Sequence, residues 1–279
     1  MASKCVRILR LSHNGYTRME PLLNIAVTAA RKAGDIILRH AEQLDRIQIT
    51  KKGENDYFSE VDVKAEQSII HAIHKAYPTH GIIAEESGAY NSDADCVWII
   101  DPLDGTNNYL HGFPCYAVSI AMLFEGRLEH AVVYDPLRHE CFAASRGRGA
   151  RLNDRRIRVS NKVDLNSAIL GSGPSMLKPS RGEAYDANVP ALLDECTSIR
   201  RMGAAALELA YVAAGRLDGF FEFKLRPWDV AAGCLLIQEA GGLVSDPNGG
   251  HDYVNSGSVI AGTPKIFDAM HKTLKSPRT

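Results

Sequence analysis

The most informative stretch of the sequence is Trp98-Ile99-Ile100-Asp101-Pro102-Leu103-Asp104-Gly105-Thr106-Asn107-Asn108. Its apolar first half predicts a buried strand that carries Asp101 and Asp104 to its carboxyl end, where Gly105 and Thr106 begin a predicted helical turn. Two neighbouring carboxylates repel each other unless a cation lies between them. Mg²⁺ takes oxygen ligands, and N–H groups at a helix N-terminus bind phosphate oxygens. The stretch therefore fits a metal-dependent phosphate site, and it fits equally well a turn in which Asp caps a helix.

Two other acidic features favour the metal site. The predicted strand 81–84 ends in the adjacent glutamates Glu85 and Glu86. Asp229 lies in the first turn of an otherwise apolar predicted helix, where its simplest role is to stabilise the helix dipole. A carboxylate at the start of so buried a helix is also well placed to complete a metal site.

Hydrophobic periodicity predicts an α+β protein of layered helices and sheets. One helix is expected to start at residue 20, a second to follow residue 62, and a third to end at about residue 196. Three more are expected over 204–214, 228–240 and 264–274. Strands are expected over 81–84, 97–100, 117–124, 128–134, 140–144, 166–171, 199–201, 219–223, 243–245 and 259–261. The Glu125–Arg127 break predicts a hairpin. Residues 19–160 and 161–279 are expected to form two halves, and residues 1–18 an N-terminal extension that is disordered or not native.

Composition excludes several classes of protein. The chain has 279 residues with 32 basic and 33 acidic side chains, so it lacks the basic excess of a dedicated nucleic-acid binder, and no direct DNA binding is expected. Six scattered cysteines form neither a disulfide framework nor a zinc motif, which favours a reducing compartment. No signal peptide and no apolar run of the roughly 20 residues needed to span a membrane is evident. A cytoplasmic protein without membrane contact is expected.

The sequence resembles the inositol monophosphatase family. The resemblance rests on the 98–109 stretch and on Trp228-Asp229-Val230-Ala231-Ala232-Gly233, and it extends from about residue 19 to residue 270. Segments 23–27, 131–136, 210–216 and 225–229 are most similar to the bacterial SuhB-like (extragenic suppressor) inositol-1-monophosphatases. The resemblance implies a layered αβαβα sandwich, a homodimer, and a lithium-sensitive, Mg²⁺-dependent phosphatase that hydrolyses inositol monophosphate by metal-activated water attack. Another small sugar or nucleotide phosphate stays open as the substrate.

The family pattern also implies roles for individual residues. The implied ligands of a first metal are Glu85, Asp101 and the Leu103 carbonyl, and those of a second are Asp101, Asp104 and Asp229. A third, weaker position near Glu85 would make two or three Mg²⁺ per site. Thr106 and Asp62 match the pair associated with the nucleophilic water, and the implied substrate contacts are Asp104, Gly105, Thr106, Ala205, Glu222 and Asp229. Two positions depart from the pattern: Asn107 replaces the usual Thr, and Ala204 replaces a Ser or Thr, which puts a helix cap or a substrate hydrogen bond in doubt.

A second function comes with the same resemblance. Proteins of the SuhB-like subgroup are associated with transcription antitermination and ribosome biogenesis through RNA polymerase and Nus factors. The arginine-rich run 146–158 fits a patch that binds an anion or a protein, but a solvated hairpin region is the simpler interpretation. The sequence leaves open which function dominates in the cell.

Overall fold

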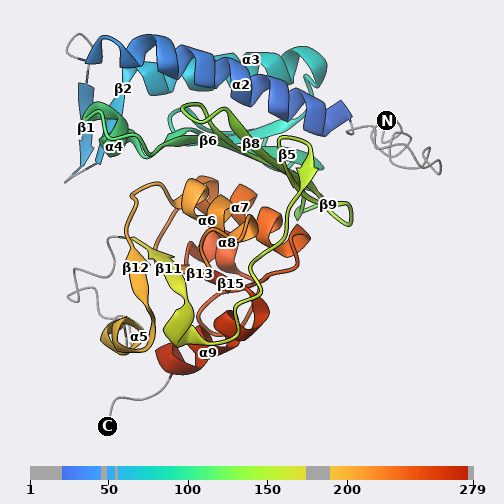
Figure 1. The fold of residues 1–279 in the computed structure, drawn as a ribbon. Coiled ribbons are helices and arrows are strands. Elements are labelled where there is room, and N and C mark those ends of the chain that lie inside the picture. Colours follow the sequence, from blue (N-terminus) through green and yellow to red (C-terminus); the bar gives the residue numbers. More distant parts are fainter. Residues whose placement is uncertain (1–20, 45–48, 54–55, 174–188, 276–279) are drawn as a thin grey trace.

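Helices and sheets alternate in five layers (Figure 1). The computed structural model describes residues 21–44, 49–53, 56–173 and 189–275. From one side to the other, the layers are a helix pair, an eight-stranded sheet, a second helix pair, a five-stranded sheet and a third helix pair. This arrangement confirms the expected α+β fold and the αβαβα order. Residues 1–18, for which an extension is predicted, lie outside the described residues.

The large sheet has the strand order β10-β9-β8-β7-β6-β5-β3-β4. In that order the strands are β10 Arg155–Arg156, β9 Gly149–Leu152, β8 Glu140–Ser145, β7 Arg127–Asp135, β6 Ala117–Phe124, β5 Cys96–Asp104, β3 Gly81–Ala84 and β4 Gly88–Tyr90. All neighbours are antiparallel except β3 and β5. Glu125 and Gly126 both have positive φ angles, as a type I′ turn requires, and join β6 to β7. The predicted hairpin is therefore confirmed.

Helices α2 (Pro21–Ala41) and α3 (Glu60–Ala76) cover one face of the large sheet. Their apolar side chains pack against Trp98, Ile100 and other residues of that face. Helix α3 begins two residues before Asp62, so the predicted start was wrong. Ser59 is the N-cap, and Asp62 closes a capping box by accepting the Ser59 N–H.

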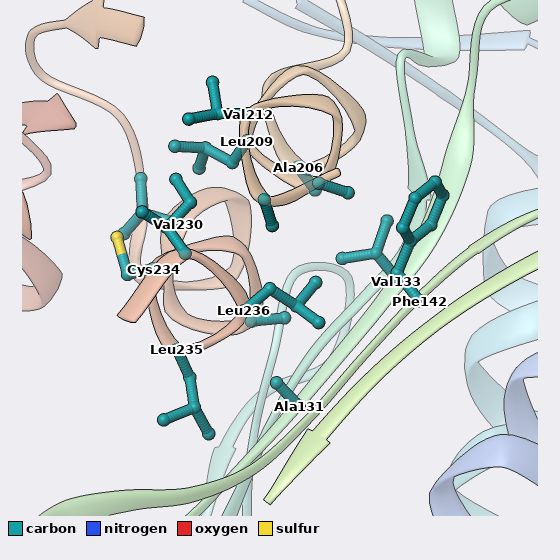
Figure 2. Close-up of a cluster of buried hydrophobic side chains, with 14 of the residues drawn as sticks. Ala131, Val133, Phe142, Ala206, Leu209, Val212, Val230, Cys234, Leu235 and Leu236 are labelled. Carbon is teal, nitrogen blue, oxygen red and sulfur yellow. The ribbon is translucent and has the colours of Figure 1, made fainter. Parts of the chain in front are cut away.

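The middle layer consists of α6 (Ala205–Ala213) and α7 (Pro227–Glu239). Both helices are buried on nearly every side because a sheet covers each face of the layer. Figure 2 shows Ala206 of α6 and Leu236 of α7 beside Val133 and Phe142 of the large sheet. This packing brings the N-terminal ends of both helices toward the end of β5.

The small sheet has the order β12-β11-β13-β15-β14. Its strands are β12 Ser198–Arg200, β11 Ile169–Ser172, β13 Gly219–Glu222, β15 Val259–Gly262 and β14 Leu243–Ser245. Helices α5 (Val189–Glu195) and α9 (Pro264–Lys275) cover its outer face. The strand expected over 166–171 starts only at Ile169, because residues 165–167 form the 3₁₀ turn η2, closed by the Ala168 N–H on the Leu165 carbonyl. The polar stretch 174–188 lies outside the described residues.

Three short elements complete the fold, namely β1 (Ile49–Gly53) paired with β2 (Asp56–Ser59), α4 (Thr106–Leu110) after β5, and α8 (Tyr253–Ser256). The large sheet uses residues before 157 and the small sheet residues after 168. The boundary expected near residue 160 stays a prediction.

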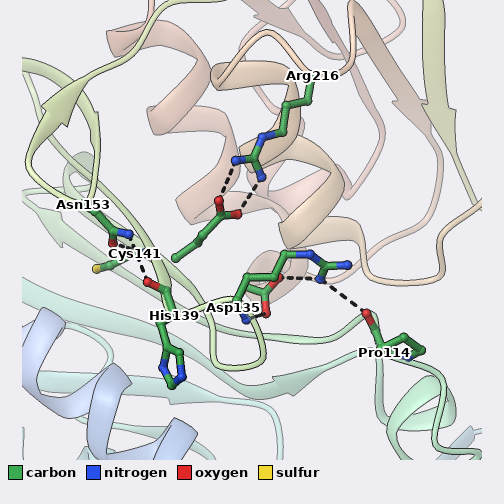
Figure 3. Close-up of polar contacts among 8 residues, drawn as sticks. Pro114, Asp135, His139, Cys141, Asn153 and Arg216 are labelled. Atoms are coloured by element: carbon green, nitrogen blue, oxygen red, sulfur yellow. Dashed lines mark hydrogen bonds and ion pairs between the residues drawn. The ribbon is translucent and has the colours of Figure 1, made fainter.

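Side-chain bonds connect the two parts of the chain. Arg216, after α6, holds the Glu140 carboxylate of β8 through two bonds of 2.6 Å (Figure 3). Its guanidinium also lies over the Tyr211 ring, 4.9 Å from the ring centroid. Among the described residues, no helix combines the length and the apolar character needed to cross a bilayer.

Candidate active site

Strand β5 positions two buried carboxylates. Asp101 is 2% exposed, and its Oδ1 accepts the Leu103 N–H at 3.0 Å. Residues three apart on a regular strand point to opposite faces. The pairing of β5 with β6 is irregular between Asp101 and Asp104, where Pro102 has no N–H to donate. This irregularity allows the side chains of Asp101 and Asp104 to point toward the same region at the end of the strand.

Asp104 also caps a helix from the other part of the chain. Its carboxylate accepts the first N–H groups of α6, from Ala205 at 3.2 Å and from Ala206 at 2.9 Å. The N-cap residue Ala204 provides no side-chain cap. The cap that the sequence put in doubt at Ala204 is thus supplied by Asp104, whose negative charge lies at the positive end of the helix dipole.

Four carboxyl groups converge beyond the end of β5. Burial raises the pKa of Asp101 well above its usual value, and repulsion from Glu85, Asp104 and Asp229 raises it further. The pKa of Asp104 is likewise raised by burial and then by Asp229. Glu85 follows β3 and Asp229 lies in the first turn of α7, so three elements bring these groups together.

This arrangement is not a closed ligand cage. Among the described residues, no three His, Cys, Asp or Glu side chains are gathered closely enough to hold a metal ion as they stand. The donor set nevertheless fits Mg²⁺, because it consists of oxygen atoms whose mutual repulsion a divalent cation would neutralise.

A threonine and a buried aspartate lie on the α3 side of the same region. Thr106 Oγ1 is 2.9 Å from Asp62 Oδ1 and 3.0 Å from the Leu103 carbonyl, and its single proton serves one of them at a time. Asp62 is fully buried, and its Oδ2 accepts the N–H and the hydroxyl of Ser59 at 2.8 and 2.6 Å. Burial raises the pKa of Asp62, and these bonds oppose the shift. The capping box of α3 therefore fixes Asp62 in the orientation that meets Thr106.

Gly105 allows the chain to turn from β5 into α4. Its φ angle of +90° is strained for residues with a side chain, and a Cβ would lie 2.9 Å from the Cys115 carbonyl. The Tyr109 N–H bonds the Gly105 carbonyl, so the N–H groups of Gly105 and Thr106 lie at the open end of the helix. Asn107 is exposed.

Glu222 and Ala205 lie on the side of the small sheet. Glu222 ends β13 and is 5% exposed. Burial raises its pKa well above the usual value, and Glu208 and Asp229 raise it further. A Cβ on Gly173 would overlap the Glu222 carboxylate as it is placed here, so Gly173 leaves room for that carboxylate. Ala205 is buried in the first turn of α6.

Sequence reasoning missed two glutamates that support the site. Glu66 of α3 is 2% exposed and accepts the N–H groups of Glu86 and Ser87 at 2.8 and 2.9 Å, which holds the turn that follows Glu85. The sequence could have revealed Glu66, because this acidic residue lies at helical spacing from Ile69 and Ile73, which face inward. Glu208 of α6 accepts the N–H groups of Met202 and Gly203, each at 3.1 Å. Glu208 was missed because the helix around it is almost wholly apolar, so the pattern indicated only a buried helix.

Asn108 joins α4 to the segment before α6. Its Nδ2 lies 2.7 Å from the Cys115 carbonyl and 2.8 Å from the Met202 carbonyl. The segment held by Glu208 is therefore held from the α4 side as well, next to Gly105.

Comparison with known proteins identifies the family. The inositol monophosphatase family matches residues 18–276. The chain belongs to this family. Its fold and its α+β layers are thus those of inositol monophosphatases, and the chain is a phosphatase-family protein of a group that generally uses Mg²⁺.

Three inositol monophosphatase relatives are informative. A Pseudomonas aeruginosa protein called Nus factor SuhB is 52% identical, over 92% of this chain and 97% of its own. The crystal structure of the extragenic suppressor protein suhB from Bartonella henselae has a TM-score of 0.87 and 42% identity, covering 91% of this chain and 98% of its own. The structure of the inositol monophosphatase from Anabaena has a TM-score of 0.79 and 35% identity, covering 91% of this chain and 94% of its own. The SuhB-like resemblance is confirmed.

Proposed function

We propose that this protein is a Mg²⁺-dependent phosphomonoesterase that hydrolyses inositol monophosphate to inositol and phosphate. The observation that carries the proposal is the 2.9 Å bond between Thr106 and Asp62 beside the four convergent carboxyl groups. Membership of the inositol monophosphatase family and the likeness to the Anabaena enzyme support the choice of substrate. Other small sugar or nucleotide phosphates are the alternative substrates.

The residues that would hold the metal ions are those that repel one another without them. Glu85, Asp101 and the Leu103 carbonyl would form one position, and Asp101, Asp104 and Asp229 a second. A third, weaker position would involve Glu85. When bound, Mg²⁺ would polarise the phosphate and increase the acidity of a water molecule.

The chain's own groups would orient the reactants. Thr106 donates its proton to Asp62 or to Leu103, so its oxygen keeps lone pairs for the attacking water. The N–H groups of Gly105 and Thr106 would bind phosphate oxygens. Glu222 and Asp229 would exchange hydrogen bonds with ring hydroxyls, and Ala205 would line that wall. Asp104 would lie next to the phosphate while it caps α6.

The decisive experiment measures phosphate release from inositol 1-phosphate, a hexose phosphate and nucleoside monophosphates, each with Mg²⁺ and with EDTA. We expect release that needs Mg²⁺ and is fastest with inositol 1-phosphate. The variant Thr106→Val keeps the size of the side chain but removes the hydroxyl, and should lose most of the activity. Asn107→Ala, at the exposed neighbouring position, is the matched control. Equal rates in EDTA and in Mg²⁺ would contradict the proposal.

A second function rests on the relatives themselves. The 52% identity to a protein called Nus factor SuhB favours a role in transcription antitermination and ribosome biogenesis, with RNA polymerase and Nus factors as partners. We infer that this second role uses a homodimer in the cytoplasm and a surface away from the carboxyl groups. An antitermination reporter in cells that carry only Asp101→Asn tests this independence. Loss of antitermination in that variant would contradict it.

A further inference from the structure

A cavity of about 420 Å³ lies between α2 and the β8–β9 hairpin. It opens on the α2 face of the large sheet at β8 and β9, three and four strands from β5, and it contains none of the residues assigned to the phosphatase site. Four arginines line it: Arg31, Arg148, Arg151 and Arg156. Among the lining residues that the structure describes, the acidic one is Asp154.

The fold places two of these arginines in direct opposition. Arg151 on β9 pairs across the ladder with Arg156 on β10, so both side chains project from the same face of the sheet. Like charges opposite each other on neighbouring strands are destabilising. No carboxylate among the described residues lies within ion-pair distance of Arg31, Arg151 or Arg156. A bound anion would supply the missing counter-charge.

The hairpin that carries the arginines is held rigidly. The N–H groups of Gly147 and Gly149 bond the two carboxylate oxygens of Glu239 in α7, at 2.8 and 2.7 Å. At the other end, Asn153 accepts the Cys141 N–H at 2.9 Å and donates to the His139 carbonyl at 3.0 Å (Figure 3). The guanidinium of Arg156 lies against Gly149, where a Cβ would be 3.2 Å from its Nε. The walls are therefore largely pre-formed, which reduces the entropy lost on binding.

Part of the cavity wall is apolar. Leu23 and Val27 lie one turn apart on one face of α2, and Ala143 of β8 lines the same cavity, while Arg31 follows one turn further along α2. Cavities of a few hundred Å³ with apolar walls and a few polar groups are typical of small-molecule sites. Arginine binds phosphate through paired N–H groups.

We propose that this arginine pocket, formed by α2 and the β8–β9–β10 strands, binds a small molecule that carries a chain of two or more phosphate groups and a flat aromatic ring. Nucleoside di- and triphosphates belong to this chemical class. Arg151, Arg156, Arg148 and Arg31 contact the phosphates, and the ring lies against Leu23 and Val27. The pocket has no part in the hydrolysis proposed above.

Isothermal titration of the full chain with ATP in EDTA, at low ionic strength, tests the proposal. Chelation separates the two sites, because phosphate binding at the carboxyl cluster depends on the metal. We expect one ATP per chain, and weaker binding of inorganic tripolyphosphate, which lacks the ring. No binding in EDTA would overturn the proposal, and equal affinity for both probes would overturn the ring-bearing ligand.

Variants localise the binding. Arg151→Gln and Arg156→Gln should each weaken ATP binding about tenfold or more. Arg155→Gln is the matched control, because Arg155 is the adjacent residue of β10, pairs with Leu152 and does not line the cavity. An equal loss in Arg155→Gln would show that only general surface charge is involved. Tighter binding of a single-stranded RNA oligonucleotide than of ATP, lost with Arg151→Gln, would overturn the small-molecule proposal in favour of nucleic acid.

Thermal unfolding provides an independent readout. Because Arg156→Gln removes the repulsion with Arg151, its Tm without ligand should equal or exceed that of the wild type. ATP in EDTA should raise the Tm of the wild type and of Arg155→Gln but not that of Arg156→Gln. If Arg156→Gln is poorly folded, Arg31→Gln on the opposite wall replaces it. An ATP-induced rise that persists in Arg31→Gln and in Arg151→Gln would refute the site.

Discussion

The electrostatic environment of Asp101 is unfavourable for a charged carboxylate. Asp101 is buried, and three other carboxyl groups raise its pKa. A protein tolerates such a group when a cation compensates the charge during function. The hydrogen bond that Asp101 accepts from the Leu103 N–H orients the carboxylate but does not neutralise it.

Asp101→Asn should therefore abolish phosphate release and leave the fold intact. The amide is the same size but offers no negative charge to either of the proposed metal positions, so transition-state stabilisation is lost. Activity is measured at saturating Mg²⁺, with Tm as the control for folding. The Tm should not fall, because the substitution removes repulsion. Turnover above about a tenth of the wild-type value would rule out Asp101 as a shared ligand.

Glu222 is the residue from which we expect substrate selectivity. Unpaired polar groups in a buried site cost roughly 1–3 kcal/mol each. Glu222→Ala should therefore reduce kcat/KM for inositol 1-phosphate much more than for p-nitrophenyl phosphate, which has no ring hydroxyls. The comparison of the two substrates in one variant is its own control for folding. Equal losses on both would remove Glu222 from the hydroxyl-binding wall.

The start of helix α6 is held in place by side chains from three elements, one of them α6 itself. Asp104 of β5 caps its first turn, and its own Glu208 bonds the preceding segment at Met202 and Gly203. Asn108 of α4 binds the same segment from the other side. Bonds from β5 and α4, together with those of Glu208, thus fix the start of α6 relative to Gly105.

Glu208 should make stability depend on pH. Burial raises its pKa to about 8 from 4.5. Below pH 4.5 the group is protonated in both the folded and the unfolded state. As pH rises from about 4.5 to 8, the unfolded state loses the proton and the folded state keeps it, so the free energy of unfolding falls, by at most about 1.4 kcal/mol per pH unit.

Glu208→Gln tests this dependence. Glutamine keeps an oxygen for the Met202 and Gly203 N–H groups but does not titrate, so the free energy of unfolding should decline less steeply between pH 5 and pH 8. Urea unfolding at a series of pH values measures the difference. Asp194→Asn, at an exposed position of α5, is the control for the loss of one carboxyl group. A slope identical to that of the wild type would show that Glu208 is ionised in the folded protein.

At the scale of the whole molecule, the proposed site lies where the two parts of the chain meet. Asp101 and Asp104 come from the large sheet, Asp229 from α7, and Glu222 from the small sheet. The fold brings them together because the middle helix layer packs against both sheets. The second metal position, made from both parts, should be the weaker one.

Mg²⁺ should stimulate the enzyme, and Li⁺ and high Mg²⁺ should inhibit it. After the ester is cleaved, Asp101, Asp104 and Asp229 would retain a cation together with the phosphate product, and slow product release would limit turnover. Li⁺ suits the same oxygen ligands with half the charge. Initial rates at several Li⁺ and substrate concentrations should show uncompetitive inhibition. Purely competitive inhibition, or full activity in EDTA, would contradict this account.

Local sequence determined the elements of this protein and the chemistry of its proposed site. Alternation and helical spacing are properties of neighbouring residues, which is why β3, β6, β14 and most helices begin and end close to the predicted residues. The two aspartates, the glycine and the threonine of the 98–108 stretch all lie within one strand and the turn after it, so the sequence alone indicated a phosphate site there. The strands β4, β9 and β10 were missed because they are short and mostly not buried, so they lack the run of apolar residues by which β3 and β14 were recognised.

Only the tertiary structure decided which distant groups meet. Asp62 accepts a hydrogen bond from Thr106, which lies 44 residues later in the sequence. Asp104 caps helix α6, which begins about 100 residues later. The arginines of the 146–158 run were separated by the fold: Arg146 bonds the Leu128 carbonyl, whereas Arg148, Arg151 and Arg156 face Arg31 of α2. Such pairings follow from the way layers stack and strands register, and no periodicity within one segment encodes them.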